Sequence, residues 1–165
     1  MRGVGAVRIL SVAALVGAPS GRPVGAAPRP RAALEETVPD LKSARQGARE
    51  RLGRPECEAV LTDFEAVTGQ RLDELLRARG RTAQEQLDLL VFESGFGRHV
   101  CDRPVLASTH VRSSAVTICL RPFGLVSRGQ QEAVLIHEML HSLGLGEGPP
   151  ESVAITAQVL KRCGH

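Results

Sequence analysis

Apolar residues recur every three or four positions between residues 34 and 52 and predict a helix there. Pro39 leaves the start of this helix undetermined, because proline is tolerated in the first turn of a helix but not in its interior. The side chains that we expect to face the core are Leu34, Val38, Leu41, Ala44, Ala48 and Leu52.

Two further helices are predicted in the first half of the chain. The second covers residues 55–67, starting at Pro55 or at the residue after it, and Gly69 ends it. Its buried stripe is expected to consist of Val60, Leu61, Phe64 and Val67. Leu72, Leu75 and Leu76 predict a short third helix over residues 72–76, which Gly80 stops.

Three compact apolar runs in the middle of the chain predict strands. The first covers residues 87–92 and is followed by a glutamate, a serine and a glycine. Residues 105–109 and 115–120 flank a polar connection and predict a hairpin. This hairpin would carry Cys101 and Cys119.

The longest predicted helix follows a capping box. Ser127 and Gln130 stand three residues apart ahead of an apolar stretch, and this helix runs to Leu143, where Gly144 stops it. A last helix is predicted after the two prolines at 149–150. Its inward side chains are expected to be Ile155, Val159 and Leu160.

Predicted helices on both sides of a small sheet indicate an α+β domain. We expect the sheet, with its disulfide-linked hairpin, to pack against the 127–143 helix and flanking helices. The chain has 165 residues and no internal repeat, which suits a single domain. It has four phenylalanines and no tyrosine or tryptophan, so leucine, valine, isoleucine and alanine must fill the core.

The N-terminus has the features of a secretory signal. Arg2 and Arg8 precede an apolar run over residues 9–18, and small residues follow at 24–27. The run is far shorter than the roughly 20 residues that cross a bilayer, which argues against a transmembrane anchor. We expect cleavage near Ala26.

This interpretation divides the chain into a signal peptide over residues 1–26, a flexible spacer over 27–33 and one domain over 34–165. Removing the signal takes away three arginines and no acidic residue, which lowers the formal net charge from +3 to zero. Acidic residues are interspersed among the remaining arginines, as on a solvated surface, so we expect no nucleic-acid partner. We expect a secreted or extracytoplasmic protein without a membrane span in its mature part.

Four cysteines lie in the predicted mature chain, at Cys57, Cys101, Cys119 and Cys163. An even number in an exported protein predicts two disulfides, with three possible connectivities. The spacing is too wide for a zinc site of the CxxC kind. Among the three connectivities we expect Cys101 with Cys119, joining neighbouring strands, and Cys57 with Cys163, joining an early helix to the last one.

Two histidines and a glutamate stand in the most apolar part of the 127–143 helix. His137 and His141 are four residues apart and share one helix face, so both imidazoles can bind one zinc ion at roughly 2.0 to 2.1 Å. Glu138 lies beside them as a candidate base. The HExxH pattern also arises by chance as an ordinary charged helix face. Here every neighbouring side chain is uncharged, and burying these groups is costly without a metal to pair them.

A third metal ligand is expected just beyond the helix. Gly144 ends the helix and lets the chain turn back, so Glu147 can approach the same metal. Glu151 is the rival ligand, but it stands at a predicted helix start, where an acidic residue commonly offsets the helix dipole. We favour Glu147.

The resulting pattern, HExxHxxGxxE over residues 137–147, resembles the metzincin clan of zinc metallopeptidases, in which the third ligand is usually histidine and sometimes aspartate. The C-terminal third also resembles a group of short exported bacterial proteins with the same motif. Through His137, His141 and Glu147, the resemblance implies a Zn²⁺ site, with Glu138 as the catalytic residue.

The chain departs from the metzincin pattern in two respects. Metzincins have a methionine turn beneath the metal, but the only methionines here are Met1 and Met139, so this turn is absent. No tyrosine is present to stabilise an oxyanion. That task would fall to zinc, with three candidate aids that are more typical of surface positions, His99, His110 and Arg112.

The sequence therefore predicts a zinc metallopeptidase that hydrolyses secreted or cell-surface peptides or proteins with a metal-activated water and Glu138 as general base. A strand between residues 105 and 120 would pair with the extended substrate. Two alternatives stay open: a zinc-stabilised binding module without catalysis, and a zinc amidase that acts on cell-wall peptides.

Overall fold

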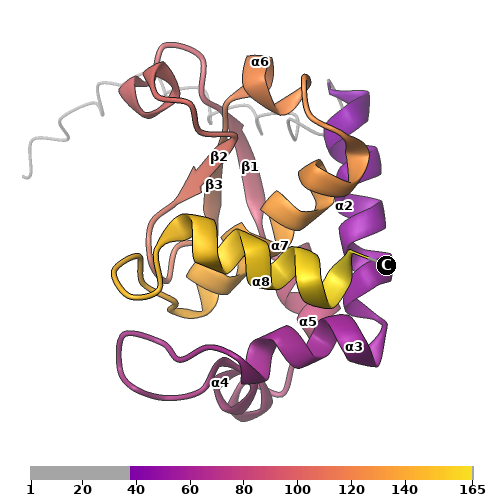
Figure 1. Ribbon diagram of the computed structural model, residues 1–165, viewed down its shortest axis with the longest axis vertical. Helices are drawn as coiled ribbons and strands as arrows, with labels where there is room; N and C mark the ends of the chain where they lie inside the picture. The colour runs from indigo at the N-terminus through magenta and orange to yellow at the C-terminus, as the bar shows by residue number, and fades with distance from the viewer. Residues whose placement is uncertain (1–37, 165) are drawn as a thin grey trace, which may run out of the picture. The chain divides into compact units, whose positions relative to one another are not determined.

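The computed structural model describes residues 38–164, which belong to one compact unit over Arg31–His165 (Figure 1). The predicted signal peptide, the spacer and the first four residues of the predicted 34–52 helix lie outside the described residues. The described elements are α2 (Pro39–Leu52), α3 (Pro55–Glu58), η1 (Ala59–Thr62), α4 (Leu72–Ala78), α5 (Ala83–Asp88), β1 (Val91–Ser94), η2 (His99–Asp102), β2 (Ala107–Thr109), β3 (Ala115–Ile118), α6 (Leu120–Phe123), α7 (Arg128–Leu143) and α8 (Ser152–Cys163). Helices thus precede and follow a small sheet, and the fold is α+β, as the sequence predicts.

The sheet has three strands in the order β1-β3-β2. β2 and β3 form the predicted antiparallel hairpin, and β1 pairs with β3 in parallel. One face is buried through Phe92, Val116 and Ile118, whereas Val91 and Ala115 on the other face are exposed. Because β2 stands at one end of the strand order, it is an edge strand, and α7 packs against it (Figure 1).

The strand predicted over residues 87–92 begins too early. Thr82 and Glu85 form a capping box that opens α5, and this helix continues to Asp88 before β1 starts at Val91. Leu87 is buried as a residue of this helix, whereas the prediction placed it in a strand. A short apolar run does not distinguish these two outcomes by its periodicity, and here the helix cap decides.

The helix predicted over residues 55–67 is also too long. The structure has α3 and then the single 3₁₀ turn of η1, which ends at Thr62. Phe64 is buried as expected, but Val67 is 64% exposed. The chain reverses here through Gly69, whose φ is +77°, and the Val67 amide donates to the Gly144 carbonyl at 2.9 Å. This loop is thereby joined to the end of α7.

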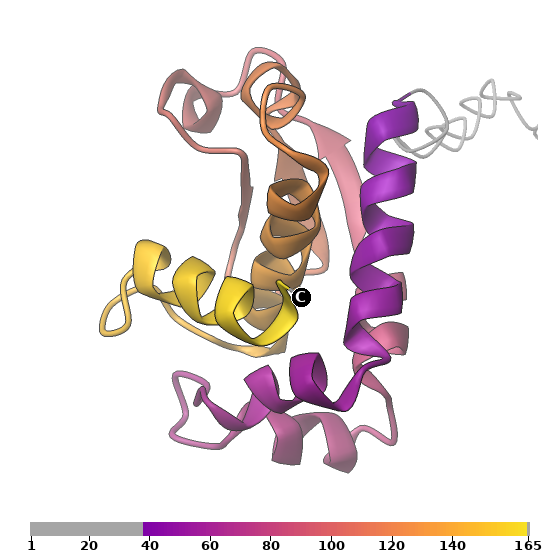
Figure 2. The same cartoon turned by 45° about the vertical axis from the view of Figure 1, so that its right-hand side comes forward.

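The core is built around α7. Its N-terminus has the predicted Ser127 and Gln130 capping box, and nearly every residue from Gln131 to Leu143 is buried. α2 packs alongside it with the predicted stripe of Leu41, Ala44, Ala48 and Leu52, and Figure 2 shows the two helices next to each other. A Cβ at Gly47 would collide with Glu132 of α7, so the glycine permits this close packing.

α8 crosses over α7 (Figure 2) and is tied down at its C-terminal end. Ile155 and Val159 are buried as predicted, but Leu160 is 38% exposed because it lies on the outer side of the helix. Arg162 binds both carboxylate oxygens of Asp63 at 2.7 Å, and this pair holds the pKa of Asp63 below its usual range. The last turn of α8 is thus joined to the segment after η1.

Both predicted disulfides are present, Cys57 with Cys163 and Cys101 with Cys119. The first joins α3 to α8 as expected. The second does not join two strands, because Cys101 lies in η2 and Cys119 directly follows β3. Among the described residues, no helix combines the length and apolar character needed to cross a bilayer.

Candidate metal centre

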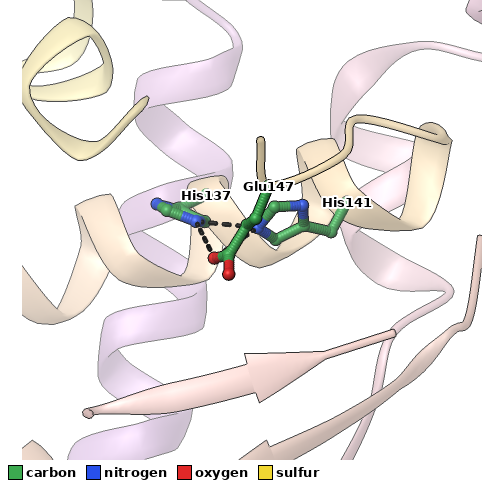
Figure 3. A group of neighbouring side chains, drawn as sticks. All are labelled: His137, His141 and Glu147. Atoms are coloured by element: carbon green, nitrogen blue, oxygen red, sulfur yellow. Dashed lines mark hydrogen bonds and ion pairs between the residues drawn. The ribbon is translucent and has the colours of Figure 1, made fainter. Parts of the chain in front are cut away.

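The two imidazoles of α7 meet at its C-terminal end. His137 and His141 are 4% and 3% exposed, and their Nε2 atoms are 2.8 Å apart. Their spacing of one helical turn brings both rings to the same face of α7, as Figure 3 shows.

Glu147 joins this pair because α7 ends where it does. Gly144 has a φ of +123°, a conformation that residues with a Cβ rarely adopt, and the chain then turns back over the helix end. Glu147 Oε1 lies 3.4 Å from His141 Nε2 and 3.8 Å from His137 Nε2 (Figure 3). In the described part of the chain, this is the one group of three such residues whose ligand atoms all lie within 4.8 Å of one another.

The other ring nitrogens are already engaged. His141 Nδ1 is 2.8 Å from the Leu145 carbonyl oxygen, so this nitrogen must be the protonated one that donates. His137 Nδ1 is 2.9 Å from the Thr156 hydroxyl of α8. Both Nε2 atoms are therefore the ones directed toward Glu147.

Burial favours a neutral His137. Loss of hydration lowers the pKa of this imidazole to about 3, and the neighbouring His141 adds to the decrease. A neutral imidazole has the unprotonated nitrogen that a metal ion requires. The same surroundings that disfavour a charged histidine thus prepare it as a ligand.

Glu138 is the second carboxylate at this place. Its side chain is 5% exposed, and its Oε2 atom has no hydrogen-bond partner within the described residues. Burial raises the pKa of Glu138 to about 8, interactions with the Thr109 side chain and backbone oppose this, and the charge of Glu147 adds to it. A cation in the same cavity would favour the ionised form.

All four residues line one cavity of about 380 Å³. Its other walls are β2, the loop that precedes β2, and the first half of α8, which supplies Ser152 and Thr156. Since one edge of β2 pairs with β3, the strand lies beside the cavity as an edge strand. The cavity therefore combines the histidine and glutamate cluster with a strand that can accept a partner.

The donor set suits a metal ion. Two imidazole nitrogens and one carboxylate oxygen are the ligands found at catalytic zinc sites, which keep a fourth position open. Atoms that share one tetrahedral zinc ion at roughly 2.0 to 2.1 Å are about 3.4 Å apart. The observed separations of 2.8, 3.4 and 3.8 Å lie around that value. His137, His141 and Glu147 could thus hold a metal ion.

The remaining candidates from the sequence lie elsewhere. Glu151 is the residue just before α8 and does not belong to the ligand cluster. His99, His110 and Arg112 are exposed and do not line the cavity, although the Arg112 amide donates to the His141 carbonyl at 2.8 Å.

Two threonines at the centre were not identified from the sequence, Thr109 beside Glu138 and Thr156 beside His137. Neither belongs to a motif, and each reaches the site only because β2 and α8 pack against α7. No local sequence signal could have identified them.

Comparisons of the chain with models of known protein families, with curated proteins and with solved structures find no match.

Proposed function

We propose that this protein is a zinc-dependent hydrolase of peptide bonds. The observation that carries the proposal is the convergence of the two Nε2 atoms and Glu147 in one cavity with the buried, incompletely hydrogen-bonded carboxylate of Glu138. A buried carboxylate beside two buried imidazoles is costly in a purely structural helix. It is useful where a proton must be moved next to a metal ion.

Each residue has a distinct task in this proposal. His137, His141 and Glu147 would hold the ion, and zinc, when bound, lowers the pKa of a coordinated water to about 7 and polarises a carbonyl group. Glu138 accepts a proton from the attacking water and passes it to the leaving amine. Thr109 orients the Glu138 carboxylate from the strand side.

β2 provides a means of holding the substrate. An extended peptide can add to the free edge of β2 through backbone hydrogen bonds, which orient a peptide bond without regard to its side chains. Because Thr109 belongs to β2 and also contacts Glu138, a peptide on this edge would lie beside the base. The substrate class that follows is an unfolded or extended segment of a peptide or protein.

The proposed place of action is outside the cytoplasm. Two disulfides tie the described unit together, and such bonds form and persist mainly in oxidising compartments. Together with the signal peptide predicted from the sequence, they favour a secreted protein.

The test combines metal analysis with a peptidase assay on a peptide library of mixed sequence. We expect about one zinc ion per chain, and Glu138→Gln should retain the ion while hydrolysis falls by about 10²-fold or more. His137→Ala should lose both the ion and the activity. Glu151→Gln is the matched control, because it changes a nearby exposed carboxylate outside the ligand cluster.

Four outcomes would count against the proposal. Carefully prepared protein without zinc contradicts the metal site, and an active Glu138→Gln contradicts the role of the base. Zinc bound without any hydrolysis would favour the zinc-stabilised binding module, whereas cleavage limited to cell-wall peptides would favour the amidase.

A further inference from the structure

α8 contributes a hydroxyl group to the candidate metal centre. Ile155 and Val159 bury one side of α8 in the core, and the intervening position 156 faces the cavity that contains the histidines. Thr156 Oγ1 lies 2.9 Å from His137 Nδ1. A helix that follows the ligand cluster in the sequence thus supports the first ligand of that cluster.

A neutral imidazole can bind a metal through Nε2 only if its proton is on Nδ1. That proton needs a hydrogen-bond acceptor when the ring is buried, since an unpaired buried donor destabilises the state that carries it. For His141 the acceptor is the Leu145 carbonyl oxygen, a backbone group that no substitution removes. For His137 the nearby acceptor is the side chain of Thr156.

We propose that Thr156 is a positioning residue of the metal centre: its hydroxyl accepts the Nδ1 proton of His137 and thereby directs the unprotonated Nε2 atom to the ion. This inference rests on the proposed function only through the presence of the metal and not through peptide hydrolysis. Outer partners of metal-binding histidines typically change metal affinity by about 10- to 100-fold when they are lost.

The chemistry of the hydroxyl predicts an order of affinities. A hydroxyl both donates and accepts, so it permits either tautomer of His137, whereas a carboxylate only accepts and selects the Nδ1 proton. Carboxylate partners also increase the basicity of the ligand. Zinc affinity should therefore rise from valine to threonine or serine, and from these to aspartate at position 156.

A merely structural role predicts a different order. Valine has nearly the shape of threonine and would fill the same half-buried space, so it would be tolerated best. Aspartate would bring a charge into that space, close to Glu138 and Glu147, and would be tolerated least. The two explanations of Thr156 thus disagree about both Thr156→Val and Thr156→Asp.

The experiment measures zinc dissociation constants by competition with a chromophoric chelator for the wild type, Thr156→Val, Thr156→Ser and Thr156→Asp. We expect zinc binding about 10- to 100-fold weaker for Thr156→Val, close to wild type for Thr156→Ser and tighter for Thr156→Asp. Ser152→Ala is the control, because Ser152 lines the same cavity from the same helix without a hydrogen bond to either histidine. Its affinity should not change.

Circular dichroism of each variant separates loss of folding from loss of the hydrogen bond. Should Thr156→Val not fold, the comparison of serine with aspartate still decides. Equal affinity of wild type and Thr156→Val, or an aspartate variant that binds more weakly than wild type, would overturn the inference. A wild type that binds no zinc would overturn this inference and the proposed function together.

Discussion

At the scale of single residues, burial gives the two carboxylates of the centre different character. Glu138 is enclosed by α7 and β2, which raises its pKa and leaves one oxygen without a partner among the described residues. Glu147 is 57% exposed, and its oxygen still approaches both imidazoles. The buried group suits proton transfer, and the exposed group suits binding of an ion at the cavity surface.

Glu147 and Glu151 lead to opposite expectations for zinc affinity. Glu147→Ala removes a proposed ligand, so its dissociation constant should rise by more than about 100-fold, beyond the usual effect of an outer residue. Glu151→Ala should leave the constant nearly unchanged, because this residue only precedes α8. Isothermal titration of both variants with zinc makes the comparison. A larger effect at Glu151 would contradict the ligand set.

At the scale of elements, the two ends of α7 position the centre. The Ser127 and Gln130 capping box starts the helix, and Gly144 ends it about one turn beyond His141. A Cβ at position 144 would lie 3.1 Å from the Ala66 Cβ, in addition to the strain of its positive φ. The glycine therefore serves both the turn toward Glu147 and the close approach of the loop around Val67.

Replacing the glycine at either end of α7 by alanine should change the free energy of unfolding in opposite directions. Gly144→Ala forces a Cβ into a left-handed conformation and should lower the free energy of unfolding by about 1 to 3 kcal/mol. Gly129 lies in the first turn of α7 with only ordinary contacts around an added Cβ, so Gly129→Ala should raise that free energy by up to about 1 kcal/mol. Urea unfolding measures both, and equal signs would be inconsistent with this account of Gly144.

At the scale of the whole described unit, α8 is the element that closes the site. It crosses α7, supplies Thr156 to His137 and is tied to α3 by the Cys57–Cys163 disulfide. That disulfide spans 106 positions, whereas Cys101–Cys119 spans 18. The longer closed loop restricts the unfolded chain more.

Removal of the two disulfides should therefore have unequal effects on stability. The chain-entropy relation gives about 4 to 5 kcal/mol for a loop on the order of 100 residues and about 3 kcal/mol for one near 15 residues. We expect the double variant Cys57→Ala with Cys163→Ala to lose more free energy of unfolding than Cys101→Ala with Cys119→Ala. Guanidinium unfolding of both variants tests this order, and the reverse order would show that native-state contacts dominate the effect.

The amino-acid sequence by itself determined the features that depend on neighbours along the chain. The burial of α7, its capping box, its end at Gly144 and the shared face of His137 and His141 all follow from helical period and turn chemistry. The disulfide pairing was predicted from the expected order of elements, and the structure confirms it. Such features are local or follow from a few strong constraints, so pattern alone predicts them.

Only the tertiary structure decided the features that depend on distant segments. The exposure of Val67 and the parallel pairing of β1 with β3 arise from how separate segments pack. The contacts of Thr109 with Glu138 and of Thr156 with His137 arise in the same way, because β2 and α8 are brought onto α7 by the core and by a disulfide. Periodicity reports which side of an element is apolar, but not which element will cover it, and that is why these residues had no signal in the sequence.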